Sequence, residues 1–323
     1  MRLVVIRTAT VVEVNVHEHI ARAMYYFSVH LLYASIVGSA AWVLTSIRGA
    51  SATTKYWIWV VTVFNFFVPF GAVIDKLWAP RLAWASPLGA IGGPVWDITQ
   101  GRTAVVLAGI WITGALTMLV RLISRLRRER CEIQVPGDRH DVTSTFVTDG
   151  IPVSFDIRHP APAVDGILSP RILLPIGIDR LLNRQELHAV LLHEMAHAKR
   201  RDNLIRLLYE VSLCALWFHP LIWLAGMQMA LYRELSCDES VIQRAHGHAM
   251  VRALAKLAVP GETMALRATA SSHLSHRLAH LAGSAQTTHR AASLLLTSLF
   301  AAVIVAGVFE TIAHTACCFV IKH

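Results

Sequence analysis

Four long apolar runs constrain this chain more than any other feature of its sequence. They cover residues 25–47, 56–74, 104–123 and 291–313, and none has Lys, Arg or Asp near its centre. A helix needs about 20 residues to cross the roughly 30 Å hydrocarbon layer of a bilayer, which matches the length of these runs. Buried helices of a large soluble protein are the alternative, but 54% hydrophobic and 16% charged residues favour four transmembrane helices.

Arginines that follow the third run set the expected orientation. The cluster comprises Arg121, Arg125, Arg127, Arg128 and Arg130. Cations that flank a span tend to stay in the cytoplasm, so we expect residues 125–290 to form a cytoplasmic domain. Residues 24–124 then hold three spans with an external loop at 75–103. Residues 291–323 hold the fourth span and a short external tail.

The net charge, the cysteines and the N-terminal residues indicate which partners, disulfides and signal peptide to expect. The formal net charge is +9, but arginines that meet anionic lipid explain much of it, and no nucleic-acid-binding signature is present. We therefore expect membrane lipid, and no nucleic acid, as a partner. Five cysteines without a C-x-x-C pair predict no disulfide framework. Residues 1–23 lack the apolar core of a signal peptide and also do not resemble a domain, and one hypothesis is that translation starts at Met24.

Residues 125–290 change from a strand pattern to a helix pattern. Short aliphatic or β-branched runs predict strands at 132–135, 144–148, 153–157 and 171–174. Helical periodicity predicts helices at 183–199, 203–217 and 221–245. Asn183 and Glu186 form a capping-box pattern at the first of these helices. Arg206 and Glu210 argue against a membrane crossing by the apolar second helix, so we expect an α+β domain that packs under the membrane or dips into its face.

The first of these helices contains the motif His193-Glu194-Met195-Ala196-His197. Residues four apart lie on the same face of a helix, so both imidazoles can bind one metal ion. Glu194 then lies beside the ion, where a carboxylate can act as general base on water. The apolar residues around the motif make unpaired His and Glu costly, which favours a zinc site over a solvated helix face. We therefore predict one catalytic Zn²⁺ held by His193 and His197, with Glu194 as the catalytic residue.

A catalytic zinc site needs a third protein ligand, and Glu234 is the best candidate. It follows His197 at a separation that lets the chain run out along one helix, turn at Pro220 and return along the next. Asp238 comes one turn later and is expected to accept a hydrogen bond from a ligating histidine. Cys237 is a rival ligand, and a solvated helix face is the alternative for both carboxylates.

Two further questions stay open at this level. The candidates for the donor that stabilises the tetrahedral oxyanion are Tyr232, Arg233, His246 and His248, each of which also fits a surface or packing role. A second metal site at helical spacing would use His273, His276 and His280. No carboxylate or cysteine accompanies these three histidines, which favours a partly exposed helix that leads to the fourth span.

These motifs make the sequence similar to a known family. Residues 162–242 resemble the BlaR/MecR type of membrane metallopeptidase, which includes beta-lactam signal transducers. The shared segments are GILSPRILLP at 166–175, HEMAH at 193–197, RD at 201–202, WFHP at 217–220 and ELSCD at 234–238. The resemblance implies a gluzincin-type fold, zinc ligands His193, His197 and Glu234, and catalysis by Glu194. It also implies a sheet edge that receives substrate as an added strand, formed by Arg171, Ile172, Leu173 and Leu174.

The resemblance also sets the expected function. It implies a multi-pass zinc metalloendopeptidase of a bacterial cytoplasmic membrane that cleaves itself, a cytoplasmic repressor, or both in signal transduction, and it allows a homodimer. Antibiotic-sensing members carry an extracellular sensor domain after the fourth span, and this sequence ends at His323, so we do not expect direct beta-lactam sensing. A membrane quality-control protease of broad specificity and a catalytically silent signalling adaptor are the alternatives.

Overall fold

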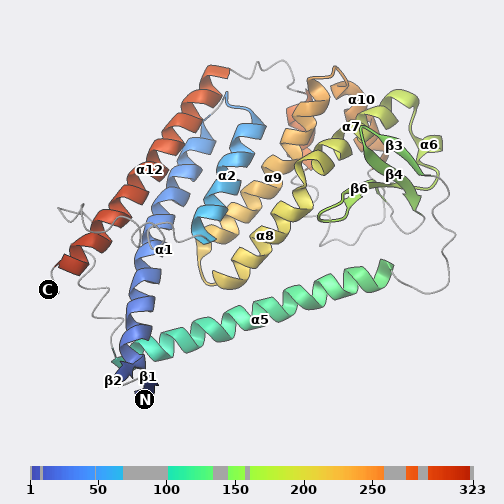
Figure 1. Cartoon of the computed structure of the whole chain (residues 1–323). Helices are drawn as coiled ribbons and strands as arrows, with labels where there is room; N and C mark the ends of the chain where they lie inside the picture. Colours follow the sequence, from blue (N-terminus) through green and yellow to red (C-terminus); the bar gives the residue numbers. More distant parts are fainter. Residues whose placement is uncertain are drawn as a thin grey trace.

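Figure 1 shows the computed structural model of the chain, which describes residues 2–7, 10–47, 49–67, 101–133, 145–156, 161–257, 274–282 and 290–320. Its long apolar helices are α1 (Val16–Ser46), α2 (Ala52–Phe67), α5 (Gly101–Ile133) and α12 (Arg290–Val320). Helices α12, α1 and α2 lie side by side, and α5 extends from the lower end of α1 beneath the other helices (Figure 1). The small sheet and the helices packed on it form a second region beside this bundle, and the helices between the two regions also pack against the bundle.

Two helices in the described part of the chain are long and apolar enough to cross a membrane. They are Thr103–Arg128 within α5 and Arg290–Gly307 within α12. Most of their side chains are exposed, as lipid-facing surfaces would be. The first predicted run corresponds to a shorter apolar segment, His30–Ser46, and α2 covers only part of the second. The rest of that second run, and most of the loop expected at 75–103, lie outside the described residues.

The N-terminal segment leads directly into the first long helix. Strands β1 (Arg2–Arg7) and β2 (Thr10–Asn15) form an antiparallel hairpin, as the β-branched residues in both favour. Helix α1 begins directly afterwards at Val16. The predicted boundary between residues 23 and 24 therefore falls inside a continuous helix.

The main sheet has the strand order β3-β4-β6-β5. Its strands are β3 (Thr145–Thr148), β4 (Ile151–Asp156), β5 (Ala163–Asp165) and β6 (Arg171–Pro175). Strand β6 pairs with β4 in parallel and with β5 in antiparallel register. Three of the four predicted strands are confirmed. The prediction at 132–135 is wrong for residues 132 and 133, which belong to the end of α5, and the short β5 was missed.

The three predicted helices of this region are confirmed. After the short α6 (Ile178–Leu181) they are α7 (Arg184–Arg200), α8 (Asp202–Ala215) and α9 (Pro220–Ile242). The Asn183 side chain accepts from the Glu186 amide and the Glu186 side chain from the Asn183 amide, so the predicted capping box is present. Pro220 occupies the first turn of α9, where its missing N–H costs nothing. Helix α10 (Gly247–Leu257) was not predicted, whereas residues 274–282 are helical, as the spacing of His276 and His280 favoured.

Helix α9 takes part in two hydrophobic cores. Its N-terminal half, including Ile222 and Met229, packs with buried residues of α1, α2 and α12. Val241 near its other end joins a core made by the sheet, α7 and α10. Glu234 and Asp238 lie between Met229 and Val241 in α9. They therefore lie where the helical bundle meets the sheet region.

Candidate metal centre

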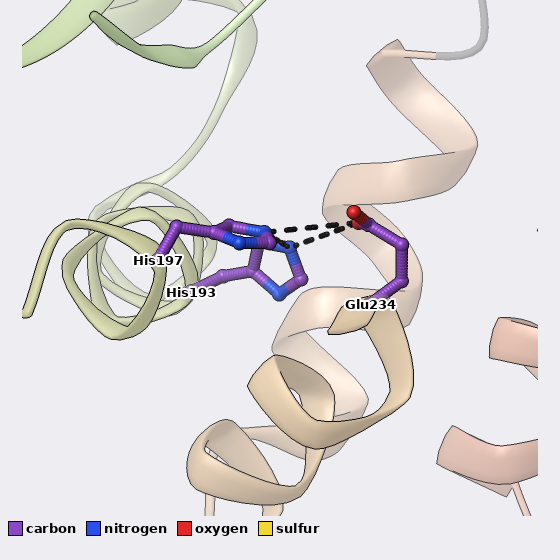
Figure 2. Close-up of side chains that lie close together, drawn as sticks. All are labelled: His193, His197 and Glu234. Carbon is purple, nitrogen blue, oxygen red and sulfur yellow. Dashed lines mark hydrogen bonds and ion pairs between the residues drawn. The ribbon is translucent and has the colours of Figure 1, made fainter. Parts of the chain in front are cut away.

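Helix α7 presents two imidazoles side by side, as the motif predicted from its helical spacing. His193 and His197 are one turn apart, and their Nε2 atoms are 3.1 Å from each other. Figure 2 shows both rings pointing from α7 towards Glu234 on α9. The side chain of His193 is only 3% exposed, so water does not replace its protein partners.

Glu234 completes a group of three donor atoms. Its Oε2 lies 3.5 Å from the Nε2 of His193 and 3.8 Å from the Nε2 of His197. Zinc bonds of about 2.0–2.2 Å at tetrahedral angles would place donor atoms roughly 3.3–3.5 Å apart. The observed spacing of 3.1–3.8 Å is close to that range. Two imidazoles and one carboxylate are also a ligand set that zinc uses with one position open, so these residues fit the metal.

The charges within this cluster show how it is held without a metal. Burial opposes the charged form of His193, but hydrogen bonds to Asp238 and Glu234 outweigh it and raise the pKa of His193 to about 9. Burial also opposes the charged form of His197, and its hydrogen bond to Asp202 raises the pKa of that imidazole. Burial favours a neutral Glu234, yet both histidines hold the pKa of its carboxyl well below the usual range. The carboxylates around the imidazoles thus favour a positive charge at this position.

A carboxylate of a neighbouring residue contacts the Nδ1 atom of each histidine and orients the ring. The Nδ1 of His193 lies 3.0 Å from Asp238 Oδ1, and the Nδ1 of His197 lies 2.6 Å from Asp202 Oδ2. A proton on Nδ1 leaves the Nε2 lone pair free for a metal, so both contacts favour the ligating tautomer. Asp238 therefore lies where the sequence placed it, whereas Asp202 had been assigned no role. The position of Asp202 in the sequence could have indicated this contact. Asp202 begins α8 directly after the turn at Arg201, five residues beyond His197.

Two arginines that the sequence did not single out surround these carboxylates. Arg277, from the helical residues 274–282, donates to both oxygens of Asp238 at 2.9 Å, and its Nη1 lies 3.6 Å from Glu234 Oε2. Arg200 donates from Nε and Nη2 to the two oxygens of Asp202, each at 2.6 Å. No spacing rule links Arg277 to α9, because the two segments meet only through tertiary packing.

Cys237, the rival ligand, is directed elsewhere. It belongs to a second group with His197 and Asp202, and it is fully buried. The guanidinium of Arg200 occupies that group and donates from Nη2 to Cys237 Sγ at 3.2 Å. Among the described residues Glu234 forms a group with both imidazoles, whereas Cys237 groups with His197 and not with His193, so the geometry favours Glu234 as the third donor.

Glu194 lies on the wall of a cavity of about 340 Å³ that opens onto the three donors. His193, His197 and Glu234 line the same cavity, together with Pro162 and Val164 beside or within β5. Glu194 thus shares the cavity with the donor cluster, and a carboxylate is a group that can act as a base on water. The cavity thus combines a cation-binding face, a candidate base and the edge of a β-sheet.

The predicted substrate strand needs correction. Arg171, Ile172, Leu173 and Leu174 lie in β6, which β4 and β5 flank on its two sides, so it is not an edge of the sheet. The strand order could not be derived from the motif, because the short β5 carries little strand signal of its own. Strand β5 is the edge strand beside the cavity. Asn203 of α8 anchors it through Nδ2, which donates to the carbonyls of Val164 and Gly166.

The candidate oxyanion donors and the histidines of the candidate second metal site differ in where they lie relative to the cavity. Arg233 lines the cavity, whereas Tyr232 donates its hydroxyl to the Thr45 carbonyl of α1. His246 packs its ring against His188, and neither His246 nor His248 lines the cavity. His276 and His280 form no metal-binding group with other described residues, and His273 lies outside the described part of the chain.

Comparison with known proteins identifies a family and several similar proteins. A family profile described as BlaR1 peptidase M56 matches residues 27–281, from α1 to the helical segment that carries Arg277. The methicillin resistance mecR1 protein of Staphylococcus aureus is 26% identical over 163 residues, which are 48% of this chain and 28% of that protein. Regulatory protein BlaR1 of Bacillus licheniformis is 30% identical over 145 residues, or 42% of this chain and 24% of that protein.

The alignments to these two relatives span only about a quarter of their length. The family profile covers far more than half of the present chain. The two long apolar helices, α5 and α12, fit a membrane location. On these grounds the chain belongs to the BlaR1 peptidase M56 family.

Proposed function

We propose that this chain is a membrane-anchored zinc metalloendopeptidase that cleaves itself, a cytoplasmic regulator, or both in a transmembrane signalling pathway. The observation that carries the proposal is the convergence of His193, His197 and Glu234, with Glu194 on the wall of the same cavity. Membership of a peptidase family and similarity to a regulatory protein support the reaction and the pathway.

His193, His197 and Glu234 would hold the zinc ion, and Asp238 and Asp202 would orient the two imidazoles. When bound, zinc polarises a carbonyl and lowers the pKa of a water molecule from about 15.7 towards 7. Glu194 accepts the proton of the attacking water and then delivers it to the leaving nitrogen of the peptide bond. Burial of the cluster keeps bulk water from competing for these groups.

The substrate is a peptide segment in extended conformation. Strand β5 offers an edge beside the cavity, and an added strand would gain main-chain hydrogen bonds there whatever its side chains are. Arg171–Pro175 would then support the substrate indirectly, as the strand that holds β5 in place.

The cellular setting is part of the same proposal. The arginines at the end of α5 support a cytoplasmic position of the peptidase region in a bacterium, next to anionic lipid. A cytoplasmic repressor is the substrate class that fits a signalling role, and a homodimer would allow one copy to cleave another.

N-terminal proteomics of cells tests this function. Cells that produce the native chain are compared with cells that produce Glu194→Gln, and new protein N-termini that depend on Glu194 are identified. We expect such termini in one regulator or in the chain itself. Cleavage of many damaged proteins would favour the quality-control alternative instead. If no terminus depends on Glu194 and the His193→Ala protein still signals, the chain is an adaptor.

Protons should compete with zinc at this site. In the metal-free fold the pKa of His193 is raised from an ordinary 6.5 to about 9, and that of His197 is raised as well. This proton binding stabilises the metal-free fold below about pH 6.5, and the stabilisation is lost as the pH rises through 9. Zinc must displace these protons, so its affinity should rise by about tenfold per pH unit for each proton released. Competition titrations between pH 6 and 9 measure this slope, and a flat profile would show that both imidazoles are already neutral.

A further inference from the structure

Helix α2 reaches the metal centre through a single hydroxyl. Tyr56 donates its Oη hydrogen to Asp202 Oδ1 at 3.0 Å, and the other oxygen of Asp202 lies 2.6 Å from His197 Nδ1. We propose that Tyr56 is a positioning residue for the metal centre, which makes an apolar helix of the bundle a structural part of the peptidase site. This inference rests on the proposed zinc peptidase function.

The position of Tyr56 is fixed by the helix that carries Glu234 and Asp238. Glu239, the residue after Asp238, accepts hydrogen bonds from the amides of Ala52 and Thr53 at 2.6 and 3.1 Å. These amides belong to the first turn of α2, whose orphan donors and positive dipole end favour a carboxylate. Tyr56 follows Ala52 by one turn and faces the same way. Helix α9 thus holds α2 in the register that brings the hydroxyl to Asp202.

Tyr56 also packs against Arg200, the residue that forms an ion pair with Asp202. The guanidinium of Arg200 stacks over the Tyr56 ring at 4.3 Å from its centroid, while it donates to both oxygens of Asp202. The Tyr56 side chain is only 1% exposed, so no water replaces its hydroxyl or its ring. Tyr56 therefore orients the Asp202 carboxylate through its hydroxyl and packs its ring against Arg200, the cation that neutralises this carboxylate.

This arrangement has a consequence for the metal. The Nδ1 hydrogen bond of His197 sets the direction of its Nε2 lone pair, and loss of such a partner typically costs 10–100-fold in metal affinity. The Tyr56 hydroxyl contacts His197 only through Asp202, so it is one hydrogen bond further from the metal. Arg200 also donates to Asp202 and would still hold it without the hydroxyl. We therefore expect loss of the Tyr56 hydroxyl to lower metal affinity by roughly three- to tenfold, which is less than the loss of a direct hydrogen-bond partner causes.

The purified full-length chain in detergent provides the test, with Co²⁺ and Zn²⁺ as the probes. Tyr56→Phe removes only the hydroxyl. Tyr33→Phe is the matched control, because Tyr33 is 2% exposed and donates its hydroxyl to the Ile304 carbonyl of α12, away from the metal centre. Both variants should lose similar thermal stability. Only Tyr56→Phe should weaken metal binding and alter the visible absorption spectrum of bound Co²⁺.

A double-mutant cycle with Asp202→Asn distinguishes positioning from a general loss of stability. If Tyr56 acts through Asp202, adding Tyr56→Phe to Asp202→Asn should cause little further loss of metal affinity. Additive losses, or a Tyr56→Phe protein that binds both metals as tightly as the native chain, would overturn the inference while the zinc peptidase function stands. A native chain that binds neither metal would overturn the proposed function and this inference together.

Discussion

Glu194→Gln should lower the rate of peptide cleavage by about 10²–10⁴-fold, the range that general acid–base catalysis contributes. The amide keeps the size of the side chain but cannot accept a proton at neutral pH. Because Glu194 lines the cavity and is outside the group of three metal donors, the variant should bind as much zinc as the native protein. Cleavage assays on the purified protein, combined with metal analysis of the same samples, measure both quantities.

Glu210→Gln is a suitable control for this substitution. Its carboxylate pairs with Arg125 and Arg206, and it does not line the cavity. The control should therefore cleave at the native rate. Equal rates for Glu194→Gln and the native chain would remove Glu194 from the mechanism, and the base would have to be sought among the other residues of the cavity.

Glu234→Ala should act on the metal itself. The substitution removes one of three donors and leaves two buried imidazoles without the carboxylate that balances a cation. Loss of a direct ligand should exceed the 10–100-fold reduction in affinity that follows loss of a ligand's hydrogen-bond partner. Zinc content after dialysis and competition with a chromophoric chelator report the change, and cleavage should fall in parallel.

Cys237→Ser separates the two possible ligand sets. The thiol is buried beside Arg200, and the serine hydroxyl can accept the same hydrogen bond, so this variant should keep its zinc. Undiminished zinc in Glu234→Ala together with loss in Cys237→Ser would move the third donor to Cys237. That result would contradict the donor geometry on which the proposed function rests.

Much of the site could be predicted because it depends on helix periodicity. The spacing of His193 and His197 places both on one face of α7, and Asp238 follows Glu234 by one turn of α9. The capping box at Asn183 and Glu186 marked where α7 begins, because the free amides at a helix start need local acceptors. These relations are set within a single helix, so neighbouring residues are enough to reveal them.

Relations between separate elements required the tertiary structure. Nothing in the sequence brings Tyr56 of α2 to Asp202, or residue Arg277 to Asp238, because each pair is joined by packing across long separations in the chain. The same holds for the sheet, where β6 has a strong strand pattern but lies inside, and the weakly patterned β5 forms the edge at the cavity. The chemistry that α7 and α9 carry could be predicted from the residues alone, since helical spacing is local. Packing decided which side chains from other elements orient that chemistry, since their proximity is a property of the whole fold.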